Sequence, residues 1–136
     1  MTLDQISTLL STPLDRGIGD RIIRDLQIDS RKIGEGKNAL FFALVGPTND
    51  GHDHVMNAYE HGVRAFVVER PVELPSDAGF LLVKNSLLAL QEIAAYVRNQ
   101  FHNPVLGITG SNGKTIVKEW IYQLVHTQKN LLRSPK

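Results

Sequence analysis

Apolar residues along the first hundred positions fall into two recurring patterns. Thr2 followed by Gln5 has the form of a capping box, and the apolar spacing after it predicts a short helix over 3–11. Compact apolar runs bounded by turn residues predict buried strands, and apolar positions three and four apart predict helices. The predicted strands are 26–29, 39–44, 63–69 and 80–83, and the later helices are 54–61 and 87–101, the last capped at Asn85-Ser86. This alternation predicts an α/β fold with substantial parallel pairing.

Pro104 marks a predicted domain boundary, because the ring of proline disfavours helical backbone at the residue before it. We therefore expect one domain at 1–103 and a second at 104–136. The second is predicted to contain a strand at 105–109, a helix at 113–125 and the start of a strand at 131–132. These elements are only the first part of a βαβ unit in a larger parallel sheet, so we expect the second domain to be truncated. Its open edges predict that 105–136 packs back on the first domain or pairs with another copy.

Charge and composition narrow the function classes. Fifteen Lys and Arg against fourteen Asp and Glu give a net charge of +1, which is too small for nucleic-acid binding by bulk charge. The chain has no cysteine, which excludes disulfides, thiolate metal sites and cysteine nucleophiles. Its apolar runs are short and its start lacks a signal-peptide pattern, so we expect a cytoplasmic protein without membrane insertion.

The glycine-rich stretch 107–115 lies between a predicted strand and a predicted helix. Small residues let backbone N–H groups turn inward around phosphate oxygens, and a helix start adds positive potential. Lys114 would reach the terminal phosphates as a catalytic cation, and the hydroxyl of Thr115 would hold Mg²⁺. The motif departs from G-x-x-x-x-G-K-[ST], since Ile108 stands five positions before Gly113. The predicted ATP-binding residues are Gly110, Ser111, Asn112, Gly113, Lys114 and Thr115; the alternative is a glycine-rich turn that carries a surface lysine.

Several segments together form a recognisable combination. They are Asp29-Ser30-Arg31, the apolar stretch 39–46, Asp50-Gly51-His52, Gly62-Val63-Arg64-Ala65, and the loop 109–115 with Lys118-Glu119. The first four resemble the uridine-nucleotide-binding domain of the Mur ligases, and the last is similar to the start of the central ATPase domain of that family. The resemblance covers nearly the whole chain. It implies an α/β amino-terminal uridine-nucleotide-binding domain followed by the first βαβ part of a P-loop ATPase domain.

The resemblance also implies an activity, with ATP and Mg²⁺ as cofactors. Family members form an amide bond in peptidoglycan precursor synthesis: ATP phosphorylates a carboxylate, and an amine attacks the acyl phosphate. The sequence is most similar to members whose substrates are UDP-N-acetylmuramoyl-tripeptide and D-alanyl-D-alanine. Three alternatives stay open: the related ligase that adds a diamino acid, a ligase fused to an alanine racemase, and a non-catalytic nucleotide-binding module. The 136 residues alone are expected to be inactive, because complete family members have a full ATPase domain and a third domain.

Matching the family motifs assigns five residues to the uridine substrate: Ser30, Arg31, Asp50, Gly51 and His52. Arg31 suits this role because its planar guanidinium can grip phosphate or stack on a base. The alternative for Arg31 is an ion pair with Asp29 or Glu35. The alternative for 50–52 is a turn that leads into a helix and is capped by Asp50 or Asp53, with His52 solvated. His52 and His54 without further ligands make a poor metal site, so no protein-bound zinc is expected.

Overall fold

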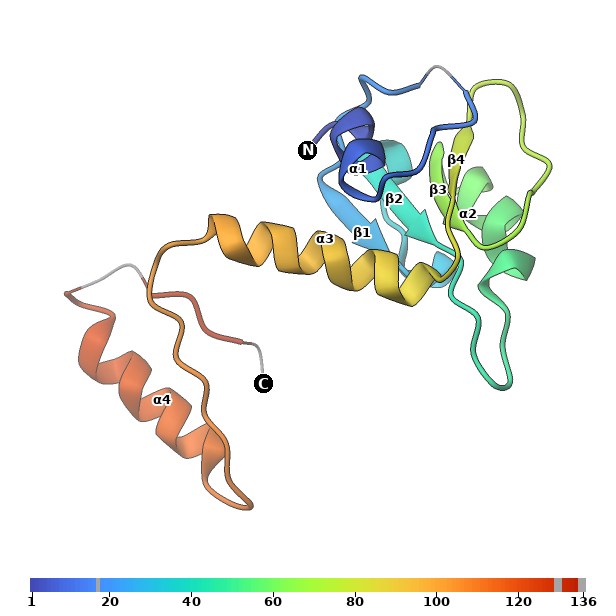
Figure 1. The fold of residues 1–136 in the computed structure, drawn as a ribbon. Helices are drawn as coiled ribbons and strands as arrows, with labels where there is room; N and C mark the ends of the chain where they lie inside the picture. The colour runs from blue at the N-terminus through green and yellow to red at the C-terminus, as the bar shows by residue number, and fades with distance from the viewer. Residues whose placement is uncertain (17, 129–130, 135–136) are drawn as a thin grey trace. The chain divides into compact units, whose positions relative to one another are not determined.

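Residues 1–16, 18–128 and 131–134 are described by the computed structural model of the chain. The chain divides into two compact units, Met1–Phe101 and His102–Lys136 (Figure 1). Among the described residues, no helix is both long enough and apolar enough to cross a membrane.

A four-stranded parallel sheet forms the centre of the first unit. Its strands are β1 (Asp25–Gln27), β2 (Ala39–Phe42), β3 (Ala65–Val68) and β4 (Gly79–Leu82). They pair in the order β1-β2-β3-β4, so each strand lies beside the next one along the chain. The register sets Leu40 opposite Ala65. Every residue of β2 and β3 is buried, as expected for parallel strands covered on both faces. All four predicted strands are confirmed, with bounds that differ by a few residues.

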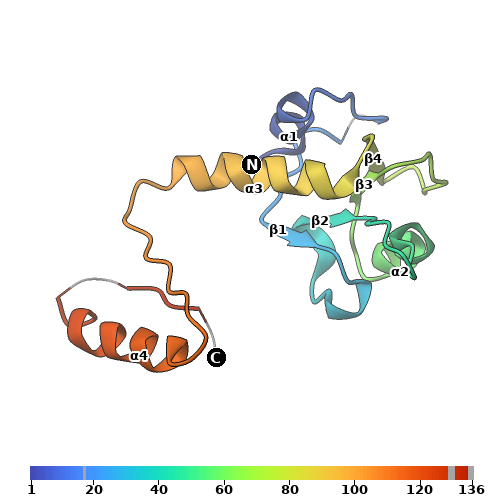
Figure 2. The same ribbon diagram turned by 60° about the horizontal axis from the view of Figure 1, so that its bottom comes forward.

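Helices cover both faces of the sheet (Figure 2). The elements are α1 (Leu3–Leu9), α2 (Val55–Glu60) and α3 (Ser86–Gln100), with short 3₁₀ helices η1 (Ser30–Lys32), η2 (Gly36–Asn38) and η3 (Gly51–His54). The predicted capping box is confirmed: the Thr2 N–H donates to Gln5 Oε1 at 2.9 Å, and the Gln5 N–H donates to Thr2 Oγ1 at 3.3 Å. Asn85 caps α3, because its Oδ1 accepts from the Leu88 N–H at 2.8 Å.

Two apolar clusters hold the layers together. One lies between the sheet and α2, and the other lies between the sheet, α1 and α3. Phe41 and Phe66 meet edge to face in the first cluster, with ring centroids 6.2 Å apart. Leu3, Ile6 and Ile93 pack from the helices into the second. Alternate residues of β2 and β3 therefore point into opposite clusters, which fixes the register of the sheet.

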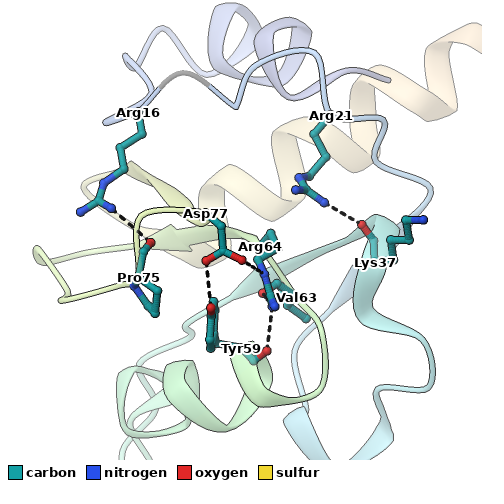
Figure 3. A network of polar contacts seen from close by, with 8 residues as sticks. All are labelled: Arg16, Arg21, Lys37, Tyr59, Val63, Arg64, Pro75 and Asp77. Atoms are coloured by element: carbon teal, nitrogen blue, oxygen red, sulfur yellow. Dashed lines mark hydrogen bonds and ion pairs between the residues drawn. The ribbon is translucent and has the colours of Figure 1, made fainter.

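A polar network secures the amino ends of β3 and β4 (Figure 3). The Tyr59 hydroxyl donates to Asp77 Oδ1 at 2.8 Å, and Arg64 Nε donates to Asp77 Oδ2 at 2.6 Å. The Arg64 guanidinium also lies 4.0 Å from the centroid of the Tyr59 ring. These contacts tie α2 to the segments that enter the two strands, at the edge opposite the one that the site motifs occupy.

The second unit contains one helix, α4 (Lys114–Val125), among its described residues. The prediction of this helix is confirmed, whereas the predicted strands at 105–109 and 131–132 are wrong: neither segment is a strand. A strand requires a hydrogen-bonded neighbour, and no described segment of this unit provides one.

The segment after α4 lies against that helix. Lys118 Nζ donates to the Ser134 carbonyl at 2.9 Å, and Arg133 pairs with Glu119. In place of the predicted βαβ unit, the described residues therefore form a loop, the helix α4 and an irregular segment that lies along this helix. The packing predicted for 105–136 stays a prediction, and residues 129–130 and 135–136 lie outside the described part of the chain.

Candidate functional site

The carboxyl ends of four parallel strands meet at one edge of the sheet. Residues 29–31 follow β1, 50–52 follow an irregular turn after β2, 69–70 follow β3 and 85–86 follow β4. In open α/β sheets, ligands bind outside the carboxyl ends of the strands. The fold thus places both predicted substrate motifs of the first unit at the edge where a ligand is expected.

Ser30 and Arg31 begin η1 at this edge. Ser30 is buried, whereas the Arg31 side chain is 85% exposed. Asp29 accepts from the Arg31 backbone N–H at 3.1 Å, from Nε at 2.9 Å and from Nη2 at 3.0 Å. The Arg31 hydrogen bonds lower the pKa of Asp29 to about 2. The alternative considered for Arg31, an ion pair with Asp29, is therefore present. This ion pair holds the exposed guanidinium in a defined position.

His52 is a buried part of the turn that precedes α2. Its side chain is 3% exposed, Nδ1 lies 2.6 Å from Asp50 Oδ1, and Nε2 accepts from the Glu69 N–H at 3.0 Å. Since Nε2 is an acceptor here, the proton of the neutral ring is on Nδ1 and is donated to Asp50. Both ring nitrogens have protein partners, and the assignment of His52 to the substrate stays a prediction. The alternative of a solvated His52 is wrong.

Asp50 fills the capping role that the sequence allowed. Its Oδ1 accepts from the His52 backbone N–H at 2.9 Å at the start of η3, and its Oδ2 lies 2.8 Å from Nη2 of Arg70. The His52 backbone hydrogen bond, followed by the His52 ring and Arg70, holds the pKa of Asp50 well below its usual range. The Asp50 carboxylate therefore binds three groups at the carboxyl edge: the His52 backbone N–H, the His52 ring and the Arg70 guanidinium.

Gly51 contributes backbone to the site, because a side chain has no room there. An added Cβ would lie 2.6 Å from Leu44 N and 2.8 Å from the carbonyl carbon of Ala43. The Gly51 N–H donates to the Leu44 carbonyl at 2.8 Å. Close packing of η3 on the end of β2 is therefore possible only with glycine at this position.

The Gly51→Ala substitution should lower the free energy of unfolding by about 1–3 kcal/mol, the usual cost of forcing extra atoms into a packed site. Urea denaturation followed by circular dichroism measures this change. Gly34→Ala is the matched control, since an added Cβ at Gly34 meets no atom within 4 Å. Equal stability of the two variants would contradict the assigned role of Gly51.

Acid should destabilise the first unit through its paired carboxylates. The pKa of Asp77 is also lowered, chiefly by the Tyr59 hydroxyl and then by Arg64. A carboxyl whose pKa is lower in the folded state stabilises the fold above its unfolded value of about 3.9, and this contribution is lost as the pH falls through the folded value. We expect a urea midpoint that is steady above about pH 5 and falls between about pH 4 and pH 2. Asp50→Asn should flatten this slope, and an unchanged slope would contradict the assignment.

Arg70 and Glu69 were not identified from the sequence, although they face the same edge. Arg70 is 53% exposed and pairs with Asp50, and Glu69 Oε1 accepts from the Ser86 N–H at 2.7 Å. The sequence feature that could have identified them is their position directly after the fully buried strand β3. Charged residues at that point lie at the carboxyl edge by topology.

The glycine-rich loop of the second unit has the backbone that an anion site requires. Gly110 has φ +152° and Gly113 has φ +77°, which are conformations that favour glycine. Gly113 is the N-cap of α4 and makes no side-chain hydrogen bond, so the cap residue itself does not compete with a ligand. Lys114 Nζ donates to the Gly110 carbonyl across the loop. A hollow lined by Ser111, Asn112, Gly113, Lys114, Thr115 and Ile116 opens at this point.

These residues fit the phosphates of a nucleotide, and they provide little for a metal alone. The Thr115 hydroxyl is the one predicted ligand, and no group of three or more His, Cys, Asp or Glu able to hold a metal occurs among the described residues. A bound Mg²⁺ would therefore need phosphate oxygens as further ligands.

Comparison with known proteins agrees with this architecture. Residues 22–126 match the model of the Mur ligase family, catalytic domain. The chain belongs to the Mur ligase family.

Relatives of two activities match at similar identity. The chain is 39% identical over 119 residues to UDP-N-acetylmuramoyl-tripeptide–D-alanyl-D-alanine ligase of Escherichia coli (strain K12), covering 88% of this chain and 25% of that protein. It is 38% identical over 117 residues to UDP-N-acetylmuramoyl-L-alanyl-D-glutamate–2,6-diaminopimelate ligase of Geobacter sulfurreducens, covering 85% and 23%. The chain thus spans about a quarter of the length of these relatives.

Solved structures extend the likeness to the fold. The UDP-N-acetylmuramoylalanyl-D-glutamyl-2,6-diaminopimelate–D-alanyl-D-alanyl ligase from Acinetobacter baumannii matches with a TM-score of 0.79 and 29% identity, covering 93% of this chain and 28% of that one. The MurF ligase from Thermotoga maritima in complex with ADP matches with a TM-score of 0.67 and 31% identity, covering 85% and 26%. The predicted fold class of the first unit is confirmed by these likenesses.

Proposed function

We propose that the chain is part of a ligase that uses ATP to join D-alanyl-D-alanine to UDP-N-acetylmuramoyl-tripeptide in peptidoglycan synthesis, in the cytoplasm. The observation that carries this proposal is that the same chain holds two features. One is a sheet edge with an exposed Arg31 held by Asp29, and the other is a glycine-rich loop that leads into a helix. The names of the similar ligases, and the ADP bound in the similar ligase from Thermotoga maritima, support the choice of substrates and nucleotide.

The loop would assist phosphoryl transfer by stabilising the negative charge of the phosphate oxygens. The ammonium of Lys114 would stabilise negative charge on the terminal phosphate oxygens, and the backbone amides that begin α4 would bind phosphate as fixed donors. The hydroxyl of Thr115 would hold Mg²⁺ together with those oxygens. ATP itself supplies the chemistry, because phosphorylation of a carboxylate provides the leaving group that amide formation needs.

A ligase that adds a diamino acid is the second candidate, because relatives of that activity match equally well. The two candidates differ in the uridine substrate as well as in the acceptor. The diaminopimelate ligase relative is named for a UDP-linked muramoyl dipeptide, whereas the D-alanyl-D-alanine ligase relative is named for a UDP-linked muramoyl tripeptide. An alanine racemase fused to the ligase would leave these substrates unchanged.

Isothermal titration calorimetry with four ligands, one of them ATP, tests the proposal on the 136-residue chain. We expect binding of UDP-N-acetylmuramoyl-tripeptide, weaker binding of the corresponding dipeptide and no binding of the dipeptide part without the nucleotide. A preference for the dipeptide would favour the diamino-acid ligase. Binding of ATP with no response to any uridine compound would favour a non-catalytic nucleotide-binding module.

A further inference from the structure

Arg70 stands at the carboxyl end of β3 with a side chain that is both exposed and held. Its Nη2 lies 2.8 Å from Asp50 Oδ2, and 53% of the side chain is exposed. A guanidinium carries five N–H donors. Within the described part of the chain, the ion-pair partner of this guanidinium is Asp50, which contacts its Nη2. Most N–H donors of the Arg70 guanidinium therefore stay available to another anion.

A series of hydrogen bonds fixes the carboxylate that holds Arg70. The Ser86 N–H donates to Glu69, the Glu69 N–H donates to His52, and His52 donates through both its backbone and its ring to Asp50. The series crosses from the start of α3 to the end of β3 and then to the turn after β2. An arginine held in this way loses less rotamer freedom when a ligand binds, which favours affinity.

Arg31 repeats the same arrangement two strands away. It is also exposed and bound to an aspartate that caps a 3₁₀ helix. Since β1 and β3 flank β2 and neighbouring strands lie about 4.8 Å apart, the two strand ends are separated by roughly 10 Å. Two guanidinium groups, each held by an aspartate and each following a strand at the same edge of the sheet, suit a ligand that carries more than one anionic group.

We propose that Arg70 is a second anion-binding residue of the uridine-substrate site, with Asp50 and His52 as the residues that position it. The group it binds is an oxygen of a phosphate or of a peptide carboxylate. This inference rests on the proposed function, because it assumes that the carboxyl edge binds the UDP-linked muramoyl peptide. It would also give Asp50 and His52 of the predicted substrate motif a role in the site, although both ring nitrogens of His52 have protein partners.

The Arg70→Met variant tests the assignment by calorimetry with UDP and with UDP-N-acetylmuramoyl-tripeptide. We expect at least tenfold weaker binding of the tripeptide precursor, the usual scale for losing a charge-assisted hydrogen bond. An equal loss for UDP assigns Arg70 to the phosphates, and a loss for the precursor alone assigns it to a carboxylate. Arg24→Met is the matched control, because exposed Arg24 precedes β1 at the opposite edge of the sheet. Its affinity should stay within twofold of the wild type.

A double-mutant cycle tests whether Asp50 acts through Arg70. Asp50→Asn should weaken precursor binding in the wild-type background and have little further effect in the Arg70→Met background. An Asp50 that only supports the fold would weaken binding equally in both backgrounds, which would overturn its positioning role. Arg70→Lys keeps the charge without the planar fork and should give an intermediate affinity, so the test survives if Arg70→Met folds poorly.

Two failures can be told apart. If the wild-type chain binds neither UDP nor the precursor, the proposed function fails and this inference fails with it. If the wild type binds the precursor and the folded Arg70→Met and Arg70→Lys variants bind it equally well, the inference alone is overturned.

Discussion

The Lys114→Ala variant should bind Mg·ATP about 10- to 100-fold more weakly than the wild type, the scale of one or two hydrogen bonds between charged groups. The reason is that Lys114 lines the hollow in which the phosphates would lie. Its amine donates to the Gly110 carbonyl of the same loop. Because that carbonyl is a neutral partner, exchange for a triphosphate oxygen strengthens the interaction of the ammonium.

Calorimetry with Mg·ATP measures this effect, and Lys118→Ala is its matched control. Lys118 lies one turn further along α4, and its ammonium donates to the Ser134 carbonyl at 2.9 Å. The control removes the same charge from the same helix at a residue that does not line the hollow. Equal losses in the two variants would mean that net charge, rather than the loop geometry, binds the nucleotide. Unchanged affinity in Lys114→Ala would remove the phosphate-loop assignment.

The Phe66→Ala variant should lose about 3–5 kcal/mol of unfolding free energy, which is a large part of the roughly 5–15 kcal/mol typical of a domain. Phe66 is fully buried in the middle of β3, and its ring meets Phe41 edge to face at 6.2 Å. Truncation therefore removes buried apolar surface, leaves a cavity between the sheet and α2, and breaks an aromatic pair.

Chemical denaturation monitored by circular dichroism measures the loss at Phe66. Phe101→Ala serves as the control, because Phe101 is 46% exposed at the end of α3 and its truncation opens no buried cavity. We expect its unfolding free energy to change by less than about 1 kcal/mol, as for most exposed positions. A Phe66→Ala protein as stable as Phe101→Ala would contradict the described core.

Local pattern was enough to predict most of the fold. The capping box at Thr2, the cap at Asn85 and the apolar runs of β2 and β3 each depend on residues that are close in sequence. The strand predicted at 105–109 depended instead on a hydrogen-bonded neighbour, which no described residue of the second unit supplies. Apolar composition alone could not reveal that difference.

Sequence motifs selected the residues of the candidate site, but the contacts of those residues could be predicted only in part. The capping role of Asp50 follows from local pattern, whereas the Glu69 N–H that donates to the His52 ring is 17 residues away in sequence. No local pattern indicates such a contact. Arg70 was missed for the same reason, since its importance follows from its pairing with Asp50 across two strands.

The strand order has a consequence for how the protein is made. Each strand pairs with the one that precedes it in the chain, and β4 ends at Leu82. On a ribosome, the sheet can therefore grow by one strand at a time, and all its strands have been synthesised well before Lys114. Since domains generally fold as units from the amino terminus during synthesis, we expect the carboxyl edge of the sheet to form while the glycine-rich loop is still being translated.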